Sequence, residues 1–426
     1  MATVTDSESL LAMGRTAQRA ARQLARHSEE TKNQALANIS DLLESEQGPI
    51  LEANRVDHEA AMASGMDEAM LDRLLLNSDR LAGMARDVRT IAGLPDPIGE
   101  VIEARTLPNG LEVERRRVPL GVIGSIYESR PNVTIDIAAL TLKSGNACLL
   151  RGGRESLNSN QALVDLLRRA IGEAGINPDT IQYVENPDRA LVDELLQMKD
   201  YIDLLVPRGG QGLINFVAAN AAMPVVAGGV GVCHAYVDRS ADLGKAASII
   251  FNAKVQRPTV CNALDTVLLH AEVAPNCLPD IARELSGAGV ELHCDHRSLS
   301  ILGPESGLNT QPADEDDWGR EFLSLTAAIK IVDSLDEALE HIETYGSGHT
   351  EAIITGDADA SWRFQLEVDA AAVIVNASTR FTDGGQLGLG AEVGISTQKF
   401  HARGPLGLRE LTSYKWVMIG DGQVRE

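Results

Sequence analysis

Ala147-Cys148-Leu149-Leu150-Arg151-Gly152-Gly153-Arg154-Glu155-Ser156 is the stretch that decides the fold class. Its first five residues form a short apolar run that ends in a charge, which is typical of a buried strand. Two glycines follow, and from Ser156 to Ile171 apolar residues recur at helical spacing. The inward face predicted for that helix consists of Leu163, Leu166, Leu167, Ala170 and Ile171. A strand, a glycine loop and a helix in this order predict one unit of a parallel sheet covered by helices.

The same alternation extends along the chain in both directions. In the first half, strands are predicted at 122–126, 147–151, 181–184, 202–206 and 224–227, with helices at 156–171, 190–198 and 211–222. In the second half, strands are predicted at 264–269, 351–354 and 372–375, with helices at 275–285, 334–344 and 357–366 and a helical pattern at Leu243, Ala246, Ala247 and Ile250. The polar, Pro/Gly/Asp-rich residues 304–319 are predicted to be a loop. Two doubly wound α/β domains are therefore expected, with ligands at the carboxyl ends of the strands.

Two regions lie outside this alternation. Residues 6–93 carry apolar side chains at helical spacing and predict a set of helices. Two extended runs, 101–107 and 111–118, flank an Asn-Gly turn and predict a β-hairpin. A hairpin this polar, outside any α/β repeat, indicates an arm that pairs with something else, and 412–419 is a further candidate strand.

The composition restricts the class of partner. A chain of 426 residues with 44% hydrophobic and 23% charged residues fits a soluble globular protein of two or three domains. Its formal net charge of -23 argues against nucleic acid and requires a local basic pocket for any anionic substrate. No run of about eighteen apolar residues and no secretory signal is evident. The odd, scattered cysteines, without a CxxC pair, indicate reduced thiols in a cytoplasm; they are Cys148, Cys233, Cys261, Cys277 and Cys294.

Lys254-Val255-Gln256-Arg257-Pro258-Thr259-Val260-Cys261-Asn262 is the strongest candidate for chemistry. Pro258 is expected to end the preceding helix, which places Cys261 at a helix-to-strand junction. Lys254 and Arg257 are close in sequence, and nearby positive charge lowers the pKa of a thiol. A thiolate is a strong nucleophile and a good leaving group in acyl chemistry. The alternative is a buried apolar cysteine without a chemical role.

Two glycine loops predict a dinucleotide site. Arg151-Gly152-Gly153-Arg154 and Pro207-Arg208-Gly209-Gly210 each join a strand end to a helix start. Free amides, a helix dipole and arginine charge suit phosphate groups, and an extra ribose phosphate favours NADP over NAD. Neither loop is GxGxxG, and a solvated basic turn capped by a serine is the alternative for the first.

Three further polar positions carry weaker signals. Asn132 follows the predicted strand 122–126, where its amide is either an oxyanion donor or a turn residue. His293-Cys294-Asp295-His296 has the residue types of a metal site, but four adjacent residues converge poorly on one ion, so no metal is expected. The segment 401–405 is polar and lies near a strand candidate, and its residues alone assign it no chemistry.

Four stretches together resemble a known family. They are Val118-Pro119-Leu120-Gly121-Val122-Ile123-Gly124, Lys143-Ser144-Gly145-Asn146, Gln256-Arg257-Pro258-Thr259-Val260-Cys261-Asn262-Ala263, and Gly394-Ile395-Ser396-Thr397-Gln398-Lys399-Phe400-His401-Ala402-Arg403-Gly404-Pro405. The chain resembles the γ-glutamyl phosphate reductases (glutamate-5-semialdehyde dehydrogenases), which belong to the aldehyde dehydrogenase superfamily and act in proline synthesis. The likeness extends over nearly the whole chain.

The resemblance implies an aldehyde-dehydrogenase-like fold of three parts. Residues 1–99 and 118–232 would form a dinucleotide-binding domain with N-terminal helices, and 233–400 a catalytic domain. Residues 100–117 and 401–426 would form an oligomerisation arm.

The resemblance also implies roles for single residues. Cys261 would be the nucleophile and Asn132 the oxyanion donor. The residues implied to bind NADP are Arg151, Arg154, Gly209, Gly210 and Glu321. Candidates for the substrate's carboxylate or phosphate are Arg130, His401 and Arg403.

One departure from the wider superfamily bears on the reaction. Hydrolytic aldehyde dehydrogenases carry a water-activating glutamate shortly before a glycine pair, whereas here the run is Val225-Val226-Ala227-Gly228-Gly229-Val230-Gly231. The absence of a carboxylate favours acyl-phosphate reduction over aldehyde hydrolysis to a free acid. The reaction that the resemblance implies is NADPH-dependent reduction of L-glutamyl 5-phosphate to L-glutamate 5-semialdehyde through a cysteine thioester.

The expected protein is therefore a cytoplasmic homo-oligomer, with the upstream glutamate kinase as a further candidate partner. Two alternatives remain open. One is a thioester-forming or hydrolytic dehydrogenase for another acid, which would differ in its dependence on phosphate. The other is a catalytically silent dinucleotide-binding protein. Loss of turnover when the thiol is alkylated would distinguish both enzymes from it.

Overall fold

The computed structural model describes residues 4–226, 228–304 and 307–425. The chain divides into two compact units. Unit 1 comprises Met1–Gly228, Gly388–Gly394 and Leu406–Glu426, and unit 2 comprises Gly229–Leu387 and Ile395–Pro405. The division lies near the domain boundary expected at 232, and residues 401–405 group with unit 2 rather than with the arm segment. Within the described residues no helix is long and apolar enough to cross a membrane.

Unit 1 is built on a four-stranded parallel sheet in the order β5-β4-β3-β6. Its strands are β3 Val122–Tyr127, β4 Ala147–Arg151, β5 Ile181–Tyr183 and β6 Leu204–Arg208. Strands β3 and β4 are buried along their whole length, which explains why they appear as continuous apolar runs in the sequence. The helices of unit 1 are α1 Val4–Leu24, α2 Glu29–Ser45, α3 Gln47–Ala63, α4 Glu68–Leu74, α5 Ser78–Gly93, α6 Asn132–Lys143, α7 Leu157–Glu173, α8 Ala190–Leu195 and α9 Gln211–Asn220. All five residues predicted for the inner face of α7 are buried.

The strand predicted at 224–227 is wrong as an element. Val225 forms a single bridge with Leu205, and residue 227 lies outside the described residues. The amide of Leu205 donates to the carbonyl of Pro224, and the amide of Val226 donates to the carbonyl of Leu205. Pro224 has no N–H to extend the ladder, and unit 1 ends at Gly228, so pairing stops after one bridge.

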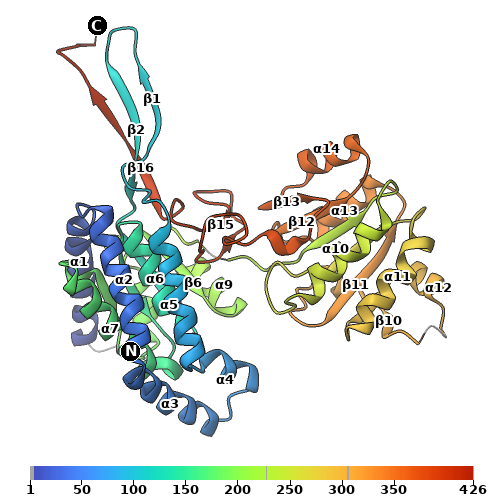
Figure 1. Ribbon diagram of the computed structural model, residues 1–426, viewed down its shortest axis with the longest axis horizontal. Coiled ribbons are helices and arrows are strands. Elements are labelled where there is room, and N and C mark those ends of the chain that lie inside the picture. The colour runs from blue at the N-terminus through green and yellow to red at the C-terminus, as the bar shows by residue number, and fades with distance from the viewer. Residues whose placement is uncertain (1–3, 227, 305–306, 426) are drawn as a thin grey trace. The chain divides into compact units, whose positions relative to one another are not determined.

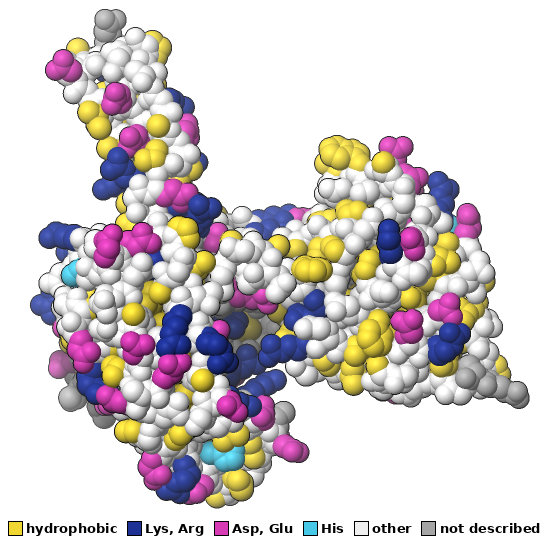
Figure 2. Space-filling model, in the orientation of Figure 1, with side chains coloured by type: hydrophobic (Ala, Val, Ile, Leu, Met, Phe, Trp, Pro, Cys, Tyr) yellow, Lys and Arg dark blue, Asp and Glu magenta, His cyan; other side chains and the backbone are white. Residues whose placement is uncertain are grey.

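A separate antiparallel ribbon belongs to unit 1. The predicted hairpin is present as β1 Val101–Thr106 and β2 Glu112–Pro119, and it pairs with β16 Thr412–Ile419 in the order β1-β2-β16. Figure 1 shows this ribbon extending away from the helices of unit 1. Hydrophobic and charged side chains are intermixed along it in Figure 2. The expectation that the hairpin pairs with another segment is thus confirmed, and that segment is the C-terminal strand.

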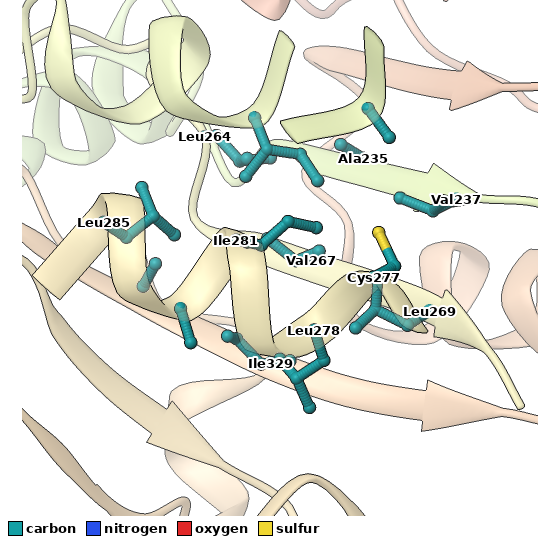
Figure 3. Close-up of a cluster of buried hydrophobic side chains, with 14 of the residues drawn as sticks. Ala235, Val237, Leu264, Val267, Leu269, Cys277, Leu278, Ile281, Leu285 and Ile329 are labelled. Atoms are coloured by element: carbon teal, nitrogen blue, oxygen red, sulfur yellow. The ribbon is translucent and has the colours of Figure 1, made fainter. Parts of the chain in front are cut away.

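Unit 2 is built on a seven-stranded parallel sheet in the order β10-β9-β11-β8-β7-β12-β13. Its strands are β7 His234–Val237, β8 Thr266–His270, β9 Glu291–Cys294, β10 Thr310–Pro312, β11 Thr326–Val332, β12 Thr350–Ile354 and β13 Ala372–Val375. The helices are α10 Leu243–Val255, α11 Ala274–Gly287, α12 His296–Leu302, α13 Leu335–Tyr345 and α14 Ala358–Glu367, and a small pair, β14 Ile395–Ser396 and β15 Gly404–Pro405, completes the unit. In Figure 3, Leu278 and Ile281 of α11 pack toward Val267, Leu269 and Ile329 of the sheet.

The loop predicted at 304–319 is partly wrong. It contains the edge strand β10, which pairs with β9, and a short 3-10 helix at Glu315–Asp317. Residues 305 and 306 lie outside the described residues. Strand β10 is short, polar and ends in Pro312, which an edge position tolerates and which an apolar pattern does not reveal. Strands β7, β9 and β11 and helices α6 and α12 are likewise elements that the sequence reasoning did not specify.

Candidate active site

Cys261 lies in the loop between α10 and β8, as predicted. Helix α10 ends at Val255, three residues before Pro258. Cys261 is partly exposed, whereas the other four cysteines are buried, and all five are free thiols. Of the cysteines, it alone is therefore accessible to a substrate.

The backbone of Cys261 is held from two sides. A Cβ placed on Gly231 would lie 1.7 Å from the Cys261 carbonyl oxygen, so only glycine fits there without a shift. The thiol of buried Cys233 donates a hydrogen bond to the same oxygen at 3.2 Å. The amide of Gly231 in turn donates to Glu321 Oε1 at 3.0 Å. Through Gly231, the structure brings Glu321 and the Cys261 loop together within unit 2, and burial raises the pKa of Glu321.

A buried ion pair supports this loop. Lys254 Nζ lies 3.6 Å from Asp265 Oδ1, and both side chains are buried. Asp265 also accepts hydrogen bonds from the amides of Phe322 and Cys233 at 3.1 and 3.4 Å. Burial lowers the pKa of Lys254 and raises the pKa of Asp265 to about 6. Lys254 is therefore ion-paired with Asp265. Its position in the sequence suggested instead that its charge acts on the Cys261 thiol.

Arg380 is a residue that the sequence reasoning missed. It lies in the short 3-10 helix Thr379–Phe381, and its Nε donates to Gln256 Oε1 at 2.7 Å. Burial is the main cause that lowers its pKa. Its signal was available, since it follows the predicted strand 372–375 and strand ends carry functional groups in such sheets.

His401 and Arg403 lie in the segment between β14 and β15. Arg403 Nη1 donates to Asp369 Oδ1 at 2.7 Å and its Nη2 donates to the Asp369 carbonyl at 3.0 Å. His401 is exposed and has a φ of 70°. The guanidinium of Arg403 is thus engaged by a carboxylate of unit 2.

Unit 1 contains a cleft of about 1220 Å³ beside the carboxyl ends of β3 and β4. Three arginines line it: Arg151, Arg154 and Arg189. Arg151 Nη2 donates to the Pro187 carbonyl at 3.1 Å, while its buried Nε has no hydrogen-bond partner among the described residues. Burial lowers the pKa of Arg151. Arg189, which follows β5, is a second basic residue that sequence reasoning missed.

The loop of Gly209 and Gly210 joins a strand end to a helix start, as predicted, and the side chain of Glu128 accepts a hydrogen bond from one of its amides. Gly210 is the N-cap of α9, and its amide donates to Glu128 Oε2 at 2.9 Å. A Cβ on Gly209 would lie 2.4 Å from the same oxygen. The helix start therefore holds an anionic oxygen, as its free amides favour, and Glu128 supplies that oxygen.

Asn132 is the first residue of α6 and not part of a turn. Its Nδ2 donates to Asp136 Oδ2 at 2.9 Å. Asn132, Arg130 and Asp136 line a pocket of about 320 Å³ in unit 1, together with residues of α4 and α5. Burial raises the pKa of Asp136 to about 6.

The His293–His296 segment has structural contacts. His293 Nδ1 lies 2.8 Å from Asp317 Oδ2, and Asp295 caps α12 by accepting from the Ser298 amide. In the parts of the chain that the structure describes, no cluster of three or more His, Cys, Asp or Glu side chains could hold a metal ion.

Comparison with known proteins decides the family. The model of the aldehyde dehydrogenase family matches residues 2–299. The γ-glutamyl phosphate reductase of Dehalococcoides mccartyi (strain CBDB1) is 57% identical over 411 residues, which cover 96% of this chain and 97% of that protein. The chain belongs to the γ-glutamyl phosphate reductase branch of the aldehyde dehydrogenase family.

Solved structures agree with the family assignment. The crystal structure of γ-glutamyl phosphate reductase from Thermotoga maritima has a TM-score of 0.95 at 49% identity and covers 98% of this chain and 100% of that chain. An acetylating aldehyde dehydrogenase from Geobacillus thermoglucosidasius shares the fold, with a TM-score of 0.70 at 17% identity over 99% of both chains. The predicted fold class and the resemblance are confirmed. As a member of this family the protein is an oxidoreductase, and aldehyde dehydrogenases use nicotinamide cofactors.

Proposed function

We propose that this enzyme uses NADPH to reduce L-glutamyl 5-phosphate to L-glutamate 5-semialdehyde and phosphate in proline biosynthesis. The observation that carries the proposal is the partial exposure of Cys261, beside four buried cysteines, in a loop fixed by Gly231 and Cys233. The names and identities of the relatives support the choice of substrate.

The first step is acyl transfer to sulfur. The Cys261 thiolate attacks the acyl carbon, a C–S bond forms, and the C–O bond to phosphate breaks so that phosphate leaves with the electron pair. We assign the developing oxyanion to the side-chain amide of Asn132 and a backbone N–H. Loss of one such donor costs about 3–4 kcal/mol of transition-state stabilisation.

The cleft of unit 1 fits a nicotinamide dinucleotide that carries an extra phosphate. It has a large volume, three arginines and a buried Arg151 Nε for which the described residues supply no hydrogen-bond partner. We assign the adenosine end to Arg151 and Arg154, and the nicotinamide ribose to Glu321. The pyrophosphate is assigned to the loop of Gly209 and Gly210, where it would replace Glu128 as the acceptor of the Gly210 amide. When bound, NADPH supplies the hydride that converts the Cys261 thioester to a hemithioacetal.

The Cys261 sulfur completes the reaction as a leaving group. When the hemithioacetal collapses, the C–S bond breaks, the thiolate is regenerated and the aldehyde is released to cyclise with its own amine. The run from Val225 to Gly231 offers no carboxylate to activate water. The acyl group on Cys261 is therefore transferred to hydride or to phosphate and is not hydrolysed.

The remaining predictions complete the proposal. Arg130, His401 and Arg403 are candidates for the substrate's charged groups, and Arg130 lines the smaller pocket with Asn132. The β1-β2-β16 ribbon is proposed as the oligomerisation arm of a homo-oligomer, because Tyr414, Trp416 and Met418 are exposed on it. We propose that unit 1 without the ribbon binds the dinucleotide and that unit 2 carries the acyl chemistry. Five free thiols fit a cytoplasmic enzyme, and the upstream glutamate kinase stays a candidate partner.

The test of this mechanism is replacement of Cys261. The Cys261→Ser variant should lose turnover and retain cofactor binding, measured by quenching of protein fluorescence. In the wild-type enzyme, semialdehyde and NADP without phosphate should give one NADPH per chain and a mass increase on the peptide that contains Cys261. A fully active Cys261→Ser variant would refute the mechanism.

A further inference from the structure

Hydrogen bonds join the segment around Arg380 to the Cys261 loop both before and after the nucleophile in the chain. Thr379 Oγ1 donates to the carbonyl of Asn262 at 2.7 Å, and Asn262 Nδ2 donates to the carbonyl of Thr382 at 2.8 Å. Asn262 and Thr379 are buried. These two bonds place Arg380, which lies between Thr379 and Thr382 in the chain, beside the residue that follows Cys261.

A third bond fixes the direction of the Arg380 side chain. Its Nε donates to the side chain of Gln256, which precedes Arg257 and Cys261 in the same loop. The Arg380 side chain is therefore held at the start of the Cys261 loop, while its neighbours Thr379 and Thr382 are hydrogen-bonded to Asn262 at the end of that loop. Arg257, Cys261 and Asp383 are close enough to act electrostatically on Arg380.

Arg380 differs from two other arginines of unit 2 in the partner of its hydrogen bond. Arg363 and Arg403, also in unit 2, are paired with carboxylates at 2.7 Å. Arg380 donates a hydrogen bond to a neutral amide, the side chain of Gln256. The nearest carboxylate in sequence, Asp383, accepts from the amides of Gly385 and Gln386 in its own turn. Arg380 is half-buried, and the planar N–H groups of a guanidinium match the paired oxygens of an oxyanion.

The charge of the whole chain makes local positive charge necessary wherever an anionic substrate binds. The formal net charge of -23 opposes the approach of a dianion, so a local cluster of positive charge has to offset it. Arg257 is exposed in the same loop and adds a second positive charge. In an acyl phosphate the phosphorus is separated from the attacked carbon by one oxygen, so its binding group must lie next to the nucleophile.

We propose that Arg380, with Arg257 beside it, binds the phosphate group that leaves from, or returns to, the acyl carbon at Cys261. The proposal rests on the function proposed above and makes the phosphate site specific, since Arg130, His401 and Arg403 are then left for the amino-acid end of the substrate. In the forward direction Arg380 stabilises the negative charge that the departing phosphate gains with the electron pair. In the reverse direction it orients phosphate for attack on the thioester.

The test measures phosphate dependence in the reverse direction, with semialdehyde and NADP held saturating. Arg380→Gln should raise KM for inorganic phosphate by about 10- to 100-fold, while KM for NADP stays within a factor of about two. Arg380→Lys keeps the charge and loses the paired N–H groups, so its KM for phosphate should lie between those of the wild type and Arg380→Gln. Arg363→Gln removes a partly exposed arginine of α14 that is hydrogen-bonded to Asp336 and Glu367, and it should leave KM for phosphate unchanged.

A second readout separates this site from the proposed function. Iodoacetate, an anion, and iodoacetamide, which is neutral, both alkylate an accessible thiol. In the wild type, inorganic phosphate should slow alkylation of Cys261 by iodoacetate more than by iodoacetamide, and Arg380→Gln should abolish the difference. Phosphate protection without phosphate-dependent turnover would support the site and refute the proposed function. Phosphate-dependent turnover with an unchanged KM in Arg380→Gln, or equal protection in both proteins, would overturn the site and leave the function standing.

Discussion

Gly231 lies so close to Cys261 that a Cβ on residue 231 would be 1.7 Å from the Cys261 carbonyl oxygen. The atom it would meet is backbone, which cannot rotate away as a flexible side chain does. The same glycine bonds Glu321, so one small residue connects the nucleophile's loop to the residue assigned to the nicotinamide ribose.

Gly231→Ala should therefore reduce kcat by about 100-fold or more, because a displacement of about 1 Å at a reacting group has that effect. KM for NADP should rise much less if the cleft of unit 1 provides most of the binding. Steady-state kinetics check both values. Gly287→Ala is the control, since nothing lies within 4 Å of a Cβ at that position; equal losses in the two variants would contradict the account.

Thiol titration should distinguish Cys261 from the other cysteines. Because four of the five thiols are buried, an aromatic disulfide reagent should modify one thiol per native chain rapidly and five in denaturant. Activity should fall in step with that first modification, and Cys261→Ser should show no fast phase. A fast phase that persists in Cys261→Ser would mean that another cysteine is the accessible one.

Cofactor preference should depend on Arg154, which is exposed in the cleft of unit 1. Arg154→Ala should raise KM for NADP by about 10-fold or more and leave KM for NAD almost unchanged, because a charge-assisted hydrogen bond to the extra phosphate is worth about 1.5–3 kcal/mol. Steady-state kinetics with each cofactor give the ratio of KM for NADP to KM for NAD. Arg169→Ala, which removes an arginine of α7 paired with Glu46, should leave the ratio as it is.

Stability should depend on pH through Asp136. Burial raises its pKa from 3.8 to about 6, so the folded protein holds this proton more tightly than the unfolded chain does. The resulting stabilisation is complete below pH 3.8 and is lost as pH rises through 6. Asp136→Asn stays neutral and can still accept from Asn132, so its free energy of unfolding relative to wild type should improve by about 1–3 kcal/mol between pH 4 and pH 7. Urea unfolding at several pH values measures this; a relative stability that falls over the same range would contradict the assigned shift.

The parts of the fold that were predictable are those with strong local patterns. Strand 147–151 and helix 157–173 carry an apolar run and helical spacing that their burial explains. Val225 and strand β10 were not predictable in the same way, since their pairing depends on a proline and on an edge position. Asn146, within one of the stretches that carry the family resemblance, has a structural role: its side chain joins Gly121 before β3 to Leu411 before β16.

The candidate site was predictable to the extent that chemistry is local in sequence. The position of Cys261 followed from Pro258 and the adjoining helix. Arg380 and Gly231 were not found, because each reaches the Cys261 loop through contacts that span about 120 and 30 residues of chain. Such contacts are set by the order of strands in the unit 2 sheet, which the sequence pattern alone does not specify.

The measurement that tests the central claim most directly is the reverse reaction. Purified enzyme is given L-glutamate 5-semialdehyde and NADP, with and without inorganic phosphate, and NADPH absorbance is followed. The account predicts sustained reduction of NADP with phosphate and at most one turnover without it. Equal sustained rates in the two conditions would mean that the acyl group is passed to water, and would contradict acyl-phosphate chemistry at Cys261.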